Sequence, residues 1–208
     1  MDKSKFVVST YDKIADKYTQ QYFDDLTDAP YIDKFLAFLP KEAKLLDVGC
    51  GPGTFTKYLL KKGFDVEGLD LSQEMLKIAK EKVPQVEFKK MDMRNLSYPN
   101  ETFDGLLVAY SLIHIPSEEI PLTLKGFSRI LKSKGQIMVI VQGGEPDKIV
   151  DEPLKKGEKI FINFFTKARL NDFLNQAGFE VEYQEELPMK DTDSLSDRVI
   201  YTIAKKLT

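Results

Sequence analysis

The stretch LLDVGCGPGTFT, residues 45–56, decides the fold. An apolar run ends in the closely spaced glycines Gly49, Gly51 and Gly53, and a helical pattern follows them. Glycine has no Cβ and tolerates a positive φ, so the backbone N–H groups of such a turn can approach a ligand closely. The stretch therefore predicts a strand of a parallel sheet, a ligand-binding turn and a helix.

A second apolar run, VEGLD at residues 66–70, stops on an acid. The carboxyl ends of neighbouring parallel strands meet at one crevice, so Asp70 can reach ribose hydroxyls of a ligand held by the glycine turn. Together the two stretches predict a nucleoside-binding crevice.

The spacing of the glycines separates the ligands that such a turn could hold. The dinucleotide fingerprint G-x-G-x-x-G needs its third glycine at position 54, where Thr54 stands. Asp47, two residues before Gly49, would repel a pyrophosphate but suits an ammonium or sulfonium group. The phosphate-loop pattern G-x-x-x-x-G-K-[ST] is absent from the stretch. The turn thus favours a cofactor with a cationic sulfur over NAD.

From residue 43 to 142 the chain resembles the class I S-adenosylmethionine-dependent methyltransferases, in particular the small-molecule methyltransferase-domain families of type 11 and 25. The resemblance rests on residues 45–53, on Asp70, and on the segments KMDM at 90–93, FDGLLVA at 103–109 and KGQIMVI at 134–140. It implies an α/β fold of three layers, α-β-α and Rossmann-like, in which strands and helices alternate. The sheet would have seven mostly parallel strands, with the last strand, 198–204, antiparallel between the fifth and the sixth.

The resemblance also implies S-adenosyl-L-methionine as the cofactor and gives roles to single residues. Asp70 would accept hydrogen bonds from both ribose hydroxyls, Asp92 would meet the adenine amino group, and the backbone of Met93 would meet the ring. A helix-capping role for Asp70 and a plain loop position for Asp92 stay open. The expected cofactor-binding residues are Tyr11, Tyr18, Asp47, Gly49, Cys50, Gly51, Gly53, Asp70, Leu71, Asp92, Met93 and Ala109.

The first 40 residues show helical periodicity in two segments. In the family such a segment often covers the cofactor as a partial lid, which would bring Tyr11 and Tyr18 near its methionine end. The alternative is that both tyrosines belong to an amphipathic packing face.

His114 is the only histidine, and it follows the fourth predicted strand, where the reacting methyl would lie. Imidazole has an ordinary pKa of about 6.5 and suits base chemistry near neutral pH, so His114 is the candidate catalytic residue. A structural or pocket-lining role is the alternative, because aligning the reactants in a dry pocket can carry methyl transfer far without a base. The segment YSLI at 110–113 replaces the Asn/Asp-Pro-Pro-aromatic tetrad of many amide- and base-directed methyltransferases, which argues against methylation of DNA adenine or glutamine.

We expect one domain over residues 1–208, with a helical lid at 1–40, a cofactor-binding core at 41–142, a substrate-side insertion at 143–165 and a C-terminal helix and strands at 166–208. The insertion could instead be a surface loop with an apolar anchor. Residues 187–197 are polar and predict a hairpin loop at the substrate rim.

Composition limits the partners. A formal charge of −3 and a pI near 5.4 give no global attraction for nucleic acid or an anionic membrane. No run approaches the ~20 apolar residues of a spanning helix, and the start of the chain lacks an apolar signal core. The single cysteine fits a reducing compartment, so we expect a cytoplasmic protein. We expect it to be a monomer or a homodimer.

The predicted function is methyl transfer to an O, N or C atom of a small molecule. One histidine and one cysteine cannot supply a zinc site, and no carboxylate triad for magnesium is evident, so no metal is expected. Two alternatives stay open: a cofactor-binding module without turnover, and an NAD-type oxidoreductase.

Overall fold

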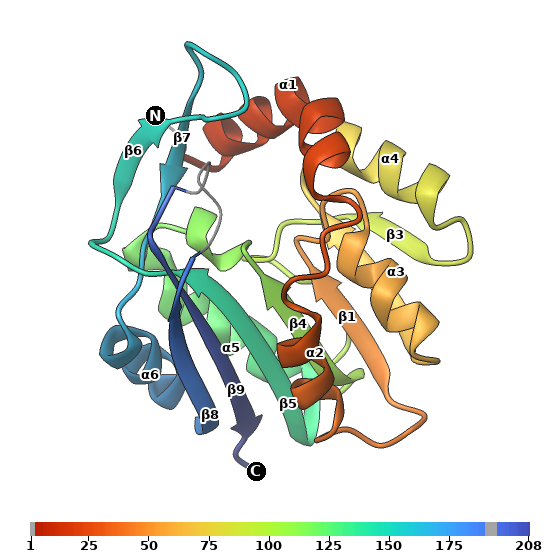
Figure 1. Cartoon of the computed structure of the whole chain (residues 1–208). Helices are drawn as coiled ribbons and strands as arrows, with labels where there is room; N and C mark the ends of the chain where they lie inside the picture. The colour runs from red at the N-terminus through yellow and green to blue at the C-terminus, as the bar shows by residue number, and fades with distance from the viewer. Residues whose placement is uncertain (1–2, 190–194) are drawn as a thin grey trace.

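The computed structural model describes residues 3–189 and 195–208. Its main sheet has seven strands in the order β3-β2-β1-β4-β5-β9-β8 (Figure 1). The first five are parallel, and β9 runs antiparallel between β5 and β8, which confirms the predicted sheet and the place of its last strand. The bounds are β1 Lys44–Val48, β2 Asp65–Asp70, β3 Glu87–Lys90, β4 Phe103–Ala109, β5 Leu131–Gln142, β8 Phe179–Pro188 and β9 Arg198–Lys206.

Helices cover both faces of this sheet. Apolar side chains of α5 and α6 are buried in one cluster with residues of β1, β4 and β5, and side chains of α2 and α3 are buried in another with alternate residues of the same strands. The helix α4 packs on β2 and β3 at one edge. The helix bounds are α1 Lys3–Tyr22, α2 Ala29–Leu36, α3 Thr54–Lys61, α4 Gln73–Lys82, α5 Ile120–Ile130 and α6 Lys167–Gln176.

Local sequence accounts for where several elements begin. The Ser72 hydroxyl accepts from the backbone N–H of Met75 and caps α4, as a serine before a helix is expected to do. Thr166 caps α6 in the same way. The strand β5 begins at Leu131, before the KGQIMVI segment at 134–140, because Leu131 pairs with Phe103 ahead of an irregularity in the register.

The connection between β3 and β4 contains no helix in the described structure. Between β3 and β4 the segment 91–102 forms turns, so the alternation of strand and helix fails there. Arg129 on α5 organises this loop by donating to the carbonyl oxygens of Leu96 and Tyr98, each at 2.7 Å.

The predicted insertion forms a hairpin of its own, β6 Lys148–Asp151 and β7 Lys159–Ile162. The segment IFINFF at residues 160–165 begins in β7, and its apolar side chains are buried in the main core. The helix α1 packs beside β7, and Thr10 donates to the carbonyl oxygen of Lys159 at 2.9 Å. Helix and hairpin lie together at the carboxyl end of the parallel strands (Figure 1).

The strand β8 extends to Pro188 and takes in the start of the predicted loop 187–197, of which residues 190–194 lie outside the described residues. No helix within the described ranges combines the length and the apolar character needed to cross a bilayer.

Candidate cofactor and acceptor site

The glycine turn ties the ends of β1 and β2 together. The N–H groups of Gly49 and Cys50 both donate to the carbonyl oxygen of Leu69, at 2.8 and 2.9 Å, and the N–H of Gly51 donates to Oδ2 of Asp70 at 2.9 Å. Gly49 and Gly51 have φ values of 72° and 53°, a region that favours glycine. The turn and the acid predicted to face one crevice are therefore in direct contact.

Gly49 is also required by a close approach from β4. A Cβ at this position would lie 2.3 Å from Cβ of Ser111, which no side chain could tolerate. Ser111 in turn donates to the carbonyl oxygen of Val48 at 2.6 Å. Sequence reasoning gave Ser111 no role; its only signal was a small polar residue just after an apolar strand.

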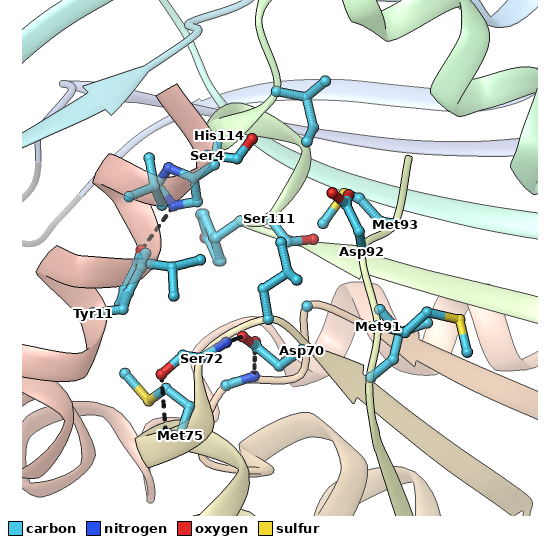
Figure 2. Close-up of a pocket in the computed structure, with 18 of the residues that line it drawn as sticks. Ser4, Tyr11, Asp70, Ser72, Met75, Met91, Asp92, Met93, Ser111 and His114 are labelled. Carbon is cyan, nitrogen blue, oxygen red and sulfur yellow. Dashed lines mark hydrogen bonds between the residues drawn. The ribbon is translucent and has the colours of Figure 1, made fainter. Parts of the chain in front are cut away.

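A cavity of about 100 Å³ opens over this turn. Figure 2 shows Asp70 and Ser72 on one side of it, Asp92 and Met93 across from them, and Tyr11 beside His114. The predicted site residues that line it are Tyr11, Tyr18, Gly49, Gly51, Asp70, Leu71, Asp92, Met93, Ala109 and His114. Residues from five separate parts of the chain thus meet at one cavity.

The Asp70 carboxylate is positioned by two backbone groups. Its Oδ2 accepts from Gly51, and its Oδ1 accepts from the N–H of Ser72 at 2.8 Å (Figure 2). A carboxylate oxygen has two lone pairs, so each oxygen keeps one for a ligand hydroxyl. Burial raises the pKa of Asp70, although these N–H donors act in the opposite direction. Ser72, and not Asp70, supplies the side-chain cap of α4.

Asp92 forms an ion pair that the sequence did not suggest. Arg94 binds its carboxylate through Nε at 3.0 Å and also contacts Glu119 through Nη1 at 2.7 Å. Partial burial acts to raise the pKa of Asp92, but the hydrogen bonds from Arg94 outweigh it and lower the pKa. Asp92 is therefore a fixed, ionised acceptor at the rim of the cavity.

Asp47 lies behind the glycine turn and is only 2% exposed. Its Oδ2 accepts from the hydroxyl of Thr56 on α3 at 2.6 Å. Burial raises the pKa of Asp47 to about 7, and the neighbouring charge of Asp70 adds to the rise. A cationic ligand beside Asp47 would reverse this effect, because an opposite charge favours the ionised carboxylate.

Two of the predicted residues are placed differently from the rest. The Cys50 side chain is buried with Phe88 and apolar residues of α4, so only its backbone belongs to the turn. Gly53 borders neither cavity in the described part of the chain; it precedes α3 with φ 89°, and a Cβ there would lie 3.3 Å from Val83.

Tyr11 and His114 are hydrogen-bonded across 103 positions of sequence (Figure 2). The Oη of Tyr11 lies 2.8 Å from Nε2 of His114, and Nδ1 of His114 lies 3.1 Å from the carbonyl oxygen of Phe161. A carbonyl can only accept, so Nδ1 carries the ring proton and Nε2 accepts from Tyr11. Burial lowers the pKa of His114 to about 4, which makes the imidazole neutral at pH 7.

The same helix is fastened to the other side of the cavity by Asp12. Its Oδ1 accepts from the hydroxyl of Ser72 at 2.5 Å. The helix α1 is thus bound to α4 by Asp12, to the turn after β4 by Tyr11 and to the hairpin by Thr10.

A larger cavity of about 680 Å³ adjoins the first, and Tyr11, Tyr18, Gly49, Gly51, Ala109 and Tyr110 border both. Asp47 and Cys50 belong to its lining, together with residues of α1, α2, the hairpin and β9. The site therefore has a narrow part beside Asp70 and Asp92, near the ends of β2 and β3, and a wide part beside the predicted insertion.

Comparison with known proteins agrees with this geometry. Residues 45–135 match the family model described as a methyltransferase domain. A demethylmenaquinone methyltransferase of Staphylococcus aureus is 30% identical over 173 residues, which cover 76% of this chain and 70% of that protein. An uncharacterized methyltransferase of Alkaliphilus oremlandii is 34% identical over 120 residues, 57% of this chain and 55% of that one.

Solved structures share the fold. A methyltransferase of Methanosarcina mazei has a TM-score of 0.77 at 22% identity and covers 86% of this chain and 97% of its own. A 1,6-didemethyltoxoflavin-N1-methyltransferase of Burkholderia thailandensis, solved with bound 1,6-didemethyltoxoflavin and S-adenosylhomocysteine, has a TM-score of 0.77 at 20% identity and covers 99% of this chain and 89% of its own.

The fold and the glycine turn define a Rossmann-like nucleoside-binding domain. The chain belongs to the class I S-adenosylmethionine-dependent methyltransferase family. It spans about half the length of the first curated relatives that it matches.

Proposed function

We propose that the protein transfers the methyl group of S-adenosyl-L-methionine to an O, N or C atom of a small molecule. The observation that carries the proposal is the contact between the glycine turn and Asp70 at a cavity that continues into a second, wider one. The first cavity has the donors and acceptors that a nucleoside needs, and the second offers room for a methyl acceptor.

The residues present fit this cofactor. Asp70 keeps a lone pair on each oxygen for the ribose hydroxyls, and Asp92 can accept from the adenine amino group while it stays paired with Arg94. Asp47 supplies a negative charge beside the turn for the ammonium or sulfonium group. Among the described residues that line the two cavities there is no lysine or arginine to pair with a diphosphate, and Asp47 would repel one.

The bound cofactor supplies an electrophilic methyl group on a positively charged sulfur. The chain supplies alignment: the turn and Asp70 fix the nucleoside, and α1 closes over the cavity and excludes water. Holding the reacting atoms in line in such a site can give effective molarities of about 10⁵ M or more.

His114 and Tyr11 provide a route for the proton that the nucleophile loses. The nucleophile would donate to Oη of Tyr11 while the Tyr11 proton moves to Nε2 of His114, and the resulting imidazolium would keep its Nδ1–H on Phe161. An imidazole with a pKa of about 4 is a weak base. This base is therefore suited to take the proton of a nucleophile that becomes acidic only once its new bond to the methyl carbon has formed.

We further propose the division of roles along the chain that the sequence predicts. Residues 1–40 act as a lid, which is supported by Tyr11 and Tyr18 at both cavities. Residues 143–165 act on the acceptor side, which is supported by Glu152, Leu154 and Ile160 in the lining of the wide cavity.

Two measurements test the function. Titration calorimetry should detect binding of S-adenosylmethionine and S-adenosylhomocysteine to the protein, and no binding of NAD. Binding of NAD alone would favour the oxidoreductase alternative. Incubation of the protein with methyl-labelled cofactor and a metabolite extract should then transfer label to a small molecule. Tight cofactor binding without any labelled product would favour the module without turnover.

A further inference from the structure

The wide cavity has an unusual balance of charge. Its lining includes the acids Asp25, Asp28, Asp47 and Glu152, whereas no lysine, arginine or histidine of the described residues belongs to it. Asp47 faces the cofactor turn. Asp28 and Glu152 come from the start of α2 and from the hairpin, so the acceptor side has acids of its own.

Asp28 is buried but only half satisfied. It is 9% exposed, and its Oδ1 accepts from the hydroxyls of Tyr201 at 2.6 Å and Tyr110 at 3.3 Å. Its Oδ2 accepts no hydrogen bond from any described residue. Burial raises the pKa of Asp28, as expected for a carboxylate with no positive charge beside it.

Glu152 repeats this arrangement on the hairpin. It is 6% exposed, and its Oε1 accepts from the backbone N–H of Leu154 at 3.0 Å, while Oε2 has no partner among the described residues. Burial raises the pKa of this carboxyl as well. Leaving one oxygen of a buried carboxylate without a hydrogen bond is costly, so two such half-satisfied carboxylates at one cavity indicate a ligand that supplies the missing donors.

Aromatic rings complete the acceptor side. Six of the nine tyrosines of the chain line the wide cavity: Tyr11, Tyr18, Tyr22, Tyr31, Tyr110 and Tyr201. Tyr31 and Tyr201 are stacked at 3.8 Å between centroids, and Tyr18 and Tyr22 are tilted at 4.9 Å. Faces of tyrosine rings attract cations as well as flat apolar groups.

We propose that the methyl acceptor of this site carries a cationic nitrogen, a protonated amine or amidine, joined to a flat apolar body. The cationic group would pair with the free oxygens of Asp28 and Glu152, and the body would pack on the tyrosines. A carboxylate or phosphate acceptor is disfavoured, because it would meet buried acids of its own charge. The inference rests on the proposed function, since it takes the wide cavity to be the acceptor site.

A matched series of probes tests this charge preference in the full chain loaded with S-adenosylhomocysteine. Tryptamine, 3-ethylindole and indole-3-propionate share a flat body and differ in carrying a positive, no or a negative charge. Calorimetry should give tryptamine an affinity at least tenfold above that of indole-3-propionate, with 3-ethylindole between them. Equal affinities, a preference for the carboxylate, or no measurable binding of tryptamine would overturn the inference.

Variants locate the preference in the cavity. Asp28→Asn and Glu152→Gln should each reduce the ratio of the two affinities at least threefold. Asp151→Asn removes one carboxylate from the same hairpin outside the cavity lining and should leave the ratio unchanged. A ratio that Asp28→Asn and Glu152→Gln leave unchanged, in variants that still bind S-adenosylhomocysteine, would overturn the assignment.

The two proposals fail in different ways. If the protein does not bind S-adenosylhomocysteine, the proposed function is wrong and the inference falls with it. If it binds the cofactor product but does not prefer tryptamine, the inference alone is wrong.

Discussion

The hydroxyl of Tyr11 donates to Nε2 of His114 at 2.8 Å and joins the first helix to the turn that follows β4. The proton on Nδ1 is fixed by the carbonyl oxygen of Phe161, so the tautomer of the ring is set from both sides. Both residues line the narrow cavity, so the pair lies where the acceptor would react in the proposed function.

The Tyr11–His114 pair predicts an unusual pH dependence. With a His114 pKa of about 4, turnover at saturating cofactor should stay level from pH 8 to 6 and fall only as the pH approaches 4. Tyr11→Phe keeps the ring but removes the hydroxyl, and should lower kcat about 10²-fold, the low end of the 10²- to 10⁴-fold that acid–base assistance typically contributes. Normal kcat with a lower Tm would instead mean that the pair only holds α1 in place.

Asp47 predicts how cofactor affinity changes with pH. Its carboxyl has a pKa of about 7 in the free protein, and a cationic ligand should stabilise the ionised form. Binding of S-adenosylmethionine should therefore release a proton below pH 7, and the affinity should rise up to about tenfold per pH unit between pH 5.5 and 7. Calorimetry in two buffers of different ionisation enthalpy measures the released proton.

The variant Asp47→Asn should remove this dependence of affinity on pH, whereas Asp65→Asn, which changes an exposed acid on β2, should preserve it.

The raised pKa of Asp47 also affects the stability of the fold. The carboxyl has a pKa of about 7 in the folded protein and 3.8 in the unfolded chain. Its contribution to the free energy of unfolding is therefore fully present below pH 3.8 and is lost as the pH rises through 7. Asp47→Asn should thus raise the Tm of the free protein at pH 8, by roughly 2–4 °C per kcal/mol, and change it less at pH 5.

Asp70 is expected to serve the ligand and the turn together. Asp70→Ala should weaken binding of S-adenosylhomocysteine tenfold or more, about 1.4 kcal/mol. It should also lower the Tm, because the N–H groups of Gly51 and Ser72 lose their acceptor. Asp70→Asn keeps one oxygen and should lie between the wild type and Asp70→Ala in both measurements. Unchanged affinity in Asp70→Ala would mean that Asp70 supports the turn alone.

Gly49 and Ser111 predict a compensating pair of substitutions. Gly49→Ala should abolish cofactor binding and lower the Tm, because its Cβ would lie 2.3 Å from Cβ of Ser111 at a positive φ. Ser111→Gly removes the clashing atoms, so the double variant should be more stable than Gly49→Ala alone. A residual loss of about 1–2 kcal/mol from the left-handed conformation should persist. If the two effects simply add, the close approach is not the reason for the glycine.

The local sequence pattern was enough to predict the part of the site that the glycine turn and the end of β2 form. The glycines at 49 and 51 and the acid at 70 are separated by few residues, and parallel strands must end side by side, so their meeting could be predicted. The caps at Ser72 and Thr166 are local as well, because each hydroxyl accepts from a backbone N–H only three residues further along the chain.

The rest depends on contacts between distant segments. No pattern around Tyr11 specifies His114, and Asp28 meets Tyr201 across 173 positions. The turns of residues 91–102 could not be predicted either, because Arg129, which organises this loop, lies on α5 and resembles any other arginine in sequence.

The strand β9 runs against its neighbours, so its last residue, Lys206, lies at the end of the sheet opposite the cavity, while α1 begins at Lys3 beside the hairpin (Figure 1). An affinity tag or a surface tether attached after β9 therefore leaves the entrance free. A bulky fusion partner ahead of α1 would instead lie next to the helix that lines both cavities.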